Sequence, residues 1–156
     1  MKQPQTCISF VINAAPVPKG RPRFSRQHNT RNVVAYTPKR TRDYEAQVLE
    51  AAKPHVTETI TEPCHIYIKV VFPRPQRLKA KRFPDGLIPH DKRPDLDNLA
   101  KAVMDGLGPL MTDDALITKM SASKYYAERG GEARTYVTII TNHDTEEDNT
   151  HDSTVL

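Results

Sequence analysis

Residues 92–120, which are the most informative part of the chain, read KRPDLDNLAKAVMDGLGPLMTDDALITKM. It opens with two carboxylates, Asp95 and Asp97, and continues into a helical pattern in which Lys101 follows four residues after the second. A Gly/Pro turn then leads to a second acidic pair at 113–114 and a strand-like segment. Acidic side chains on both sides of one turn indicate a site for a divalent cation.

Residues 95–107 are predicted to form a helix. Pro94 favours a boundary directly before Asp95, because the residue that precedes a proline is biased to an extended conformation. Two glycines and a proline just after the pattern end the helix. One face of this helix should be buried, and its apolar residues are Leu96, Leu99, Ala100, Val103 and Leu107.

The spacing of the first two acids constrains where they can lie. Side chains two positions apart within a helix point about 200° away from each other, so they cannot meet at one ion. They can meet if Asp95 lies at or before the helix start and Asp97 in its first turn. Asp97, Lys101 and Asp105 then line up at i, i+4 and i+8. A carboxylate from beyond the turn would complete an oxygen-rich site for Mg²⁺ or Mn²⁺, and the lack of accompanying Cys or His argues against zinc.

The same acids also have a simpler structural interpretation. Asp95 could cap the helix and Asp97 could complement its dipole. Lys101 would then be an exposed partner in an i,i+4 pair, and Asp113 and Asp114 could be turn residues. For an acid-x-acid pair taken alone this interpretation is the more common one, and only the complete set of residues shifts the balance toward a metal site.

Length and composition bound the class of protein. A chain of 156 residues suits one domain with a modest core. The apolar runs are too short to span a bilayer, and the N-terminus lacks the apolar region of a signal peptide, so we expect a cytoplasmic protein. Cys7 and Cys64 have no paired spacing, which predicts two reduced, buried thiols and no disulfide framework.

Charge is distributed unevenly along the chain. Residues 143–156 contain five acids and no Lys or Arg, and we expect this tail to be disordered beyond a single domain at 1–142. Because all 23 Lys and Arg and 14 of the 19 acids precede the tail, residues 1–142 carry a net charge of +9. Residues 14–42 contain eight basic residues and no acid, and residues 69–93 contain eight against two acids. Such clusters fit a polyanionic partner, with ordinary solvated loops as the alternative.

The remaining pattern predicts an α+β fold. Prolines rule out regular structure in the basic loop that follows the first strand, and a second basic, proline-rich loop occupies 73–94. The residues ERGGEA are expected to form a hairpin turn between the last two strands. The resulting order is β-α-β-α-β-β, with helices packed on one face of a mixed sheet. The other predicted elements are a strand at 6–13, a helix at 38–53, a strand at 64–72, and strands at 115–127 and 133–141.

The string RPDLDNLAKAVMDGL, followed by DDALI, resembles the RusA family of Holliday-junction resolvases. The family pattern is an Asp-Leu-Asp-Asn-Leu segment, a Lys four residues after its second Asp, and a downstream Asp-Asp. The likeness is strong over residues 93–117, about one sixth of the chain. Elsewhere it consists of the order of elements and a basic N-terminal loop, and both basic loops are longer than in compact family members.

This resemblance implies a function and assigns residues to it. It identifies Asp95, Asp97 and Asp114 as metal-binding catalytic carboxylates and Lys101 as the functional lysine. It implies a homodimeric, Mg²⁺-dependent endodeoxyribonuclease of phage or prophage type, with Mn²⁺ as a substitute. Such an enzyme makes paired symmetric nicks in a four-way DNA junction during recombination and repair. Candidate phosphate contacts are Arg21, Arg23, Arg26, Arg74, Arg77, Lys79 and Arg93.

Three other functions compete with a junction resolvase. A general nuclease for flaps or forks would use the same chemistry. A silent junction-binding module is disfavoured, because unneutralised acids near phosphates weaken binding. A nucleotide-sugar transferase also uses an acid-x-acid metal site, but this chain is short for one and too basic. His90, near the acidic pair, is expected to be a surface loop residue, and Tyr125 and Tyr126 to pack within a strand.

Overall fold

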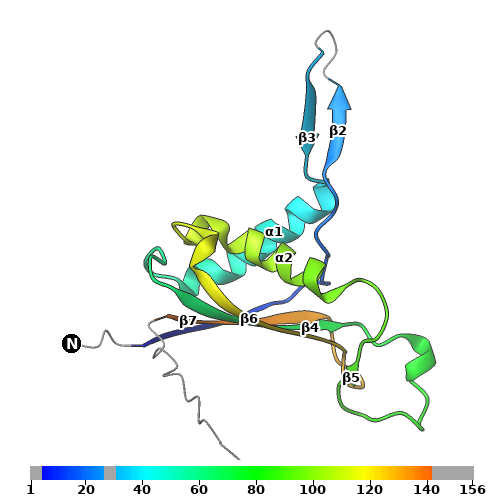
Figure 1. Ribbon diagram of the computed structural model, residues 1–156. Coiled ribbons are helices and arrows are strands. Elements are labelled where there is room, and N and C mark those ends of the chain that lie inside the picture. The colour runs from blue at the N-terminus through cyan, green and yellow to red at the C-terminus, as the bar shows by residue number, and fades with distance from the viewer. Residues whose placement is uncertain (1–4, 27–30, 142–156) are drawn as a thin grey trace, which may run out of the picture.

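The computed structural model describes residues 5–26 and 31–141, and the predicted acidic tail lies outside them. A five-stranded sheet carries two helices on one face, and a two-stranded hairpin projects away from this body (Figure 1). The predicted α+β class, with helices on one face of a mixed sheet, is confirmed. No helix in these ranges is long and apolar enough to cross a bilayer.

Every predicted helix and strand is present, with bounds that differ by two residues at most. Three strands were not predicted, namely the two strands of the hairpin and a two-residue strand before the second helix. In chain order the elements are β1 (Thr6–Ile12), β2 (Arg23–Arg26), β3 (Val33–Tyr36), α1 (Lys39–Ala52), β4 (Cys64–Phe72), β5 (Ile88–Pro89), α2 (Leu96–Leu107), β6 (Ile117–Tyr126) and β7 (Arg134–Thr141).

The order of strands in the sheet is β1-β7-β4-β6-β5. β7 runs antiparallel to both β1 and β4, whereas β4 and β6 are parallel. The predicted hairpin between β6 and β7 is therefore wrong, because β4 lies between these two strands. Their connection turns at Gly130, whose φ is +76°. It passes the end of β4, where the Ala127 amide donates to the Phe72 carbonyl at 2.7 Å.

The basic loop after β1 was predicted to lack regular structure, and this is wrong for its second half. Prolines at 16, 18 and 22 keep the chain irregular only up to residue 22. Beyond them every backbone amide can donate, and Arg23–Arg26 pairs with Val33–Tyr36 in an antiparallel register. The β-branched Val33 and Val34 favour the extended conformation of the second strand.

The core lies between the two helices and the sheet. Leu99, Val103 and Leu107 of α2 are buried as predicted, and Leu96 is half-buried. The sheet contributes the inward residues of its central strands, and Cys64 is buried among them whereas Cys7 is exposed, against the prediction for that thiol. The inward residues of β4 and β7 are Ile66, Ile68, Val70, Val137 and Ile139.

The two helices approach each other closely at Gly106. A Cβ atom built there would lie 2.8 Å from the Cβ of Val48 and 2.9 Å from the carbonyl oxygen of Glu45. Both distances are shorter than non-bonded carbon and oxygen atoms tolerate. The absence of a side chain at this position therefore lets α1 and α2 pack side by side over the sheet.

We predict that Gly106→Ala destabilises the fold. The added methyl group pushes α1 and α2 apart, and such overpacking costs about 1–3 kcal/mol. This outweighs the roughly 1 kcal/mol that alanine gains over glycine in helix propensity. Urea unfolding followed by circular dichroism should show a lower midpoint. The matched control is Gly86→Ala, where an added Cβ meets nothing within 4 Å, and equal midpoints for both variants would contradict the proposed packing.

Candidate functional site

The first two predicted carboxylates lie at the start of α2, with Asp95 before the helix and Asp97 within it, as predicted. Asp95 is the N-cap residue and has an extended backbone, with φ −69° and ψ 143°, whereas Asp97 lies in the first turn. Both residues are exposed. The Asp95 side chain makes no capping hydrogen bond. The capping interpretation therefore does not hold for Asp95, and its carboxylate remains free for another ligand.

Lys124 of β6 holds the segment that precedes Asp95. Its Nζ donates to the carbonyl oxygens of Lys92 at 2.5 Å and Pro94 at 2.6 Å. The backbone amide of His90 donates to the carbonyl of Lys124 at 3.2 Å. The start of α2 is thereby tied to the sheet. This role of Lys124 was not predicted, because one Lys in a strand carries no signal of a contact 30 residues away.

His90 lies inside the structure and is not the surface residue that was predicted. Its ring stacks on Tyr126 with centroids 4.1 Å apart and meets the edge of Phe72 at 4.7 Å. Its Nδ1 accepts a hydrogen bond from the Lys92 amide at 3.1 Å. Burial, together with the nearby charge of Lys124, lowers the pKa of His90. The imidazole is therefore neutral at pH 7 and acts as a packed support for the loop that leads to Asp95.

Asp114 lies across the Gly/Pro turn from α2 and begins a short 3₁₀ turn, Asp114–Leu116, that leads into β6. The structure brings Asp114 and Lys101 to the same surface hollow, with a volume of about 360 Å³. The residues that line this hollow are Lys101, Met104, Asp105, Asp114, Ile117, Thr118, Lys119 and Met120. Two of the predicted catalytic residues, from segments on opposite sides of the turn, thus share one space, whereas Asp95 and Asp97 lie nearer the other end of α2.

The three predicted metal ligands differ from two other acids of the same segment. Within the part of the chain that the structure describes, the carboxylates of Asp95, Asp97 and Asp114 make no hydrogen bond or ion pair, whereas those of Asp105 and Asp113 are engaged. Asp113 accepts a hydrogen bond from the Ala115 amide at 2.8 Å. Asp105 forms ion pairs with lysine side chains. The exposed, unpartnered oxygens are those available to a cation.

These acids do not form a closed metal cage. Among residues 5–26 and 31–141, no group of three or more His, Cys, Asp or Glu side chains is arranged to hold a metal ion. The donor chemistry nevertheless fits a hard cation, because all three candidate ligands supply carboxylate oxygens. Mg²⁺ is usually bound through one or two protein carboxylates, with water and substrate phosphate completing its shell. Such a site needs no preformed three-ligand cluster.

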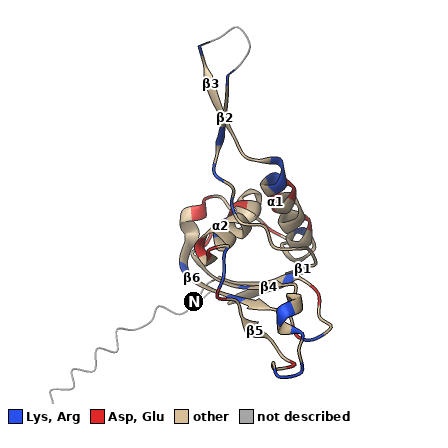
Figure 2. Ribbon diagram, turned by 90° about the vertical axis from the view of Figure 1, so that its right-hand side faces the viewer, with Lys and Arg blue, Asp and Glu red and all other residues tan. Residues whose placement is uncertain are grey.

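Most of the predicted phosphate contacts are on the surface. Figure 2 shows basic segments on the hairpin, at the start of α1 and in the loop after β4, with acidic segments beside α2. Arg77 is exposed and also donates to the hydroxyl of Tyr126 at 3.2 Å. The other exposed members of the predicted set are Arg21, Arg23, Arg26, Lys79 and Arg93.

Arg74 has a different role from the phosphate contact that was predicted. It is only 7% exposed, and its guanidinium donates to backbone carbonyls that close the loop after β4. Arg129 supports the same loop through an ion pair with Asp85 at 2.7 Å. A buried arginine of this kind cannot be told from a surface one by sequence alone. The carbonyl partners of Arg74 are those of Ala127, Leu78, Pro84, Asp85 and Gly86.

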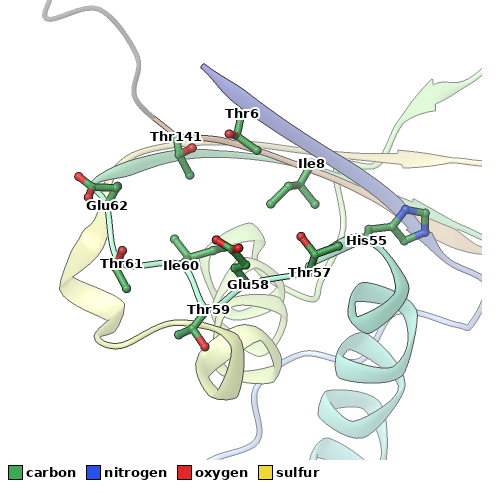
Figure 3. Close-up of a pocket in the computed structure, with 10 residues that line it drawn as sticks. All are labelled: Thr6, Ile8, His55, Thr57, Glu58, Thr59, Ile60, Thr61, Glu62 and Thr141. Carbon is green, nitrogen blue, oxygen red and sulfur yellow. The ribbon is translucent and has the colours of Figure 1, made fainter. Parts of the chain in front are cut away.

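A second hollow of about 350 Å³ lies between β1, the end of β7 and the segment that follows α1 (Figure 3). Threonines and two acids, Glu58 and Glu62, dominate its lining, and no Lys or Arg contributes to it. None of the predicted site residues lines it. A phosphate would meet two negative charges there and no Lys or Arg, so this hollow does not fit a nucleic acid.

Comparison with known proteins gives a family match that covers the candidate site. Residues 13–140 match the family described as Endodeoxyribonuclease RusA, a range that includes every predicted site residue. The chain is also 33% identical over 129 residues to "Uncharacterized protein YqaN" of Bacillus subtilis (strain 168), a similarity that covers 78% of this chain and 89% of that one. The unpartnered carboxylates around α2 and the basic side chains on the surface agree with this match. The chain belongs to the RusA endodeoxyribonuclease family.

Proposed function

We propose that this protein is a Mg²⁺-dependent endodeoxyribonuclease that resolves four-way DNA junctions in recombination and repair. The observation that carries the proposal is the set of exposed, unpartnered carboxylates around α2 in a chain of the RusA family. A homodimer would supply two such sites, one for each of the paired symmetric nicks. Mn²⁺ would substitute for Mg²⁺, since both prefer oxygen ligands.

Asp95, Asp97 and Asp114 would hold the cation together with the scissile phosphate. When bound, Mg²⁺ supplies positive charge to the phosphate oxygens and makes a nearby water more acidic. The protein's task is to place the phosphate. The rigid start of α2, tied to β6 through Lys124, fixes Asp95 and Asp97 relative to the strand that follows Asp114.

Lys101 is available to the reacting phosphate. Its side chain is 59% exposed, and its one ion-pair partner among the described residues, Asp105, lies 3.6 Å away. Asp105 has a shorter contact with Lys19, at 2.7 Å, so its charge is already largely neutralised. Lys101 is therefore free to stabilise the negative charge that develops on the phosphoryl group as the bond to water forms.

The paired residues Asp113 and Asp114 provide a sharp test of the carboxylate assignment. We predict that Asp114→Asn reduces cleavage of a labelled four-way junction by about 10²-fold or more, because several kcal/mol of charge stabilisation depend on the bound cation. Asp97→Asn should behave in the same way. Asp113→Asn should cut normally, since its side chain serves the turn and an Asn oxygen can still accept from Ala115.

The same reaction decides between the resolvase and its competitors. With Mg²⁺ or Mn²⁺ the wild-type protein should place symmetric nicks in the junction, spare linear duplex, and do nothing in EDTA. Equal cutting of flaps and forks would establish a general branched-DNA nuclease in place of a resolvase. Binding of all variants without cleavage under any metal would establish a silent module, and full activity of Asp114→Asn would remove that residue from the site.

The exposed basic side chains of Lys79 and Arg93 should bind DNA through phosphate contacts. We predict that the double variant Lys79→Gln/Arg93→Gln binds junctions of different sequence more weakly to a similar degree. Each lost phosphate contact should lower the slope of log affinity against log salt by about 0.9. Fluorescence anisotropy in EDTA measures both quantities. Lys53→Gln, an exposed charge beyond the far end of α1, is the control, and an unchanged slope in the double variant would exclude this surface.

A further inference from the structure

The β2–β3 hairpin stands apart from the body of the protein (Figures 1 and 2). All eight residues of its two strands are exposed. They include large apolar side chains, with Phe24 71% exposed and Val33 56% exposed. Burial in the core does not account for these side chains, since none of them reaches it. A surface that keeps aromatic and β-branched residues in water is typical of a binding surface.

The strand register distributes these side chains over two faces. Arg23 lies opposite Tyr36, and Phe24 lies opposite Ala35. Since side chains alternate along a strand and directly paired residues share a face, each face carries one aromatic ring and one arginine. One face holds Arg23, Ser25, Val34 and Tyr36, and the other holds Phe24, Arg26, Val33 and Ala35.

The root of the hairpin is bonded to the start of the candidate site. The Lys19 amide donates to the carbonyl of Asn98, the residue after Asp97, at 2.9 Å. The Lys19 side chain also bridges Glu45 and Asp105, each at 2.7 Å. The next amide, that of Gly20, donates to the hydroxyl of Thr41 on α1 at 3.1 Å. The direction in which the hairpin leaves the body is thus set at the first turn of α2.

The charge of the hairpin selects the kind of partner. Arg23, Arg26 and Arg31 are exposed, and residues 14–42 contain no acid. Two copies of the hairpin packed against each other would bring these like charges together, which is unfavourable. A polyanion with apolar groups between its charged rims satisfies both the arginines and the apolar side chains. Duplex DNA has this arrangement, with phosphates flanking the base edges in each groove.

We propose that the β2–β3 hairpin is an arm that lies in the major groove of the duplex leading away from the cut phosphate. The ligand class rests on the proposed function. The major groove, about 12 Å wide, admits a two-stranded ribbon. Four residues per strand extend about 13 Å, or roughly four base pairs. The arginines contact phosphates of the groove walls, and Phe24 packs on base edges. Because the root is fixed beside Asp97, the arm sets which phosphate reaches the carboxylates.

Dimethyl sulfate footprinting of the full-length protein on a labelled four-way junction in EDTA tests the arm. The wild type should protect guanine N7, a major-groove atom, over about four base pairs on one duplex flank of the nick. Phe24→Ser/Val33→Ser should lose this protection and bind about tenfold more weakly, while Arg23→Gln/Arg26→Gln should lower the salt slope by about 1.8. Both variants alter only exposed positions, and their unfolding midpoints should equal that of the wild type.

Other outcomes overturn the assignment. Protection of adenine N3 in place of guanine N7 would put the arm in the minor groove, and identical footprints for wild type and arm variants would exclude it from DNA. Loss of a dimer in sedimentation with either arm variant would make the hairpin a contact between subunits. Lys53→Gln should leave footprint and affinity unchanged. If the wild type shows the arm footprint but cuts nothing with Mg²⁺ or Mn²⁺, the DNA-binding arm is supported and the proposed nuclease activity is excluded. If the wild type cuts the junction without that footprint, the nuclease activity is supported and the arm is excluded.

Discussion

The charge-paired Lys19 ammonium connects three parts of the molecule that the sequence keeps far apart. It joins the segment after β1 to Glu45 on α1 and Asp105 on α2. Burial opposes the charge of Lys19, but the hydrogen bonds to Asp105 and Glu45 outweigh it and raise the pKa of the amine. Its stabilising contribution is therefore fully present below the ordinary lysine pKa and is lost only as pH rises through the higher pKa of the folded state.

Two features of the candidate site depend on Lys19. Its backbone amide donates to the carbonyl of Asn98 in the first turn of α2, so the root of the hairpin is held beside Asp97. Asp105 is occupied by Lys19, and consequently Lys101, which shares the same face of α2, is not immobilised by it. Lys101, the single lysine of α2, is therefore not committed to a pair within its own helix and, under the proposed function, remains available to a phosphate.

Local patterns in the sequence predicted the helices, four of the strands and the position of Asp95 ahead of Asp97, because periodicity and a proline boundary act within a few residues. Pairing between distant segments was not predictable in this way. The placement of β4 between β6 and β7 depends on which edges meet across more than 50 residues, and no turn residue encodes it. The interior positions of Arg74 and His90 likewise depend on a loop that closes around them. Asp113 accepts a hydrogen bond and Asp114 does not, and this difference depends on the folded turn, so the sequence could not predict it.

Two arginines, the buried Arg74 and the exposed Arg129, order the loop after β4. Arg74 and Arg129 use their donors on the carbonyls and the carboxylate of this loop, which holds it in one conformation before any ligand arrives. Arg77 and Lys79 are then presented from an ordered backbone. Ordering a loop during association reduces affinity, so a loop ordered in advance loses less on binding. The long proline-rich segment, an unlikely scaffold by composition, is therefore held in one conformation from within. Under the proposed function, removing Arg74 should weaken DNA binding without removing any contact to phosphate, because the loop would lose the donors that order it.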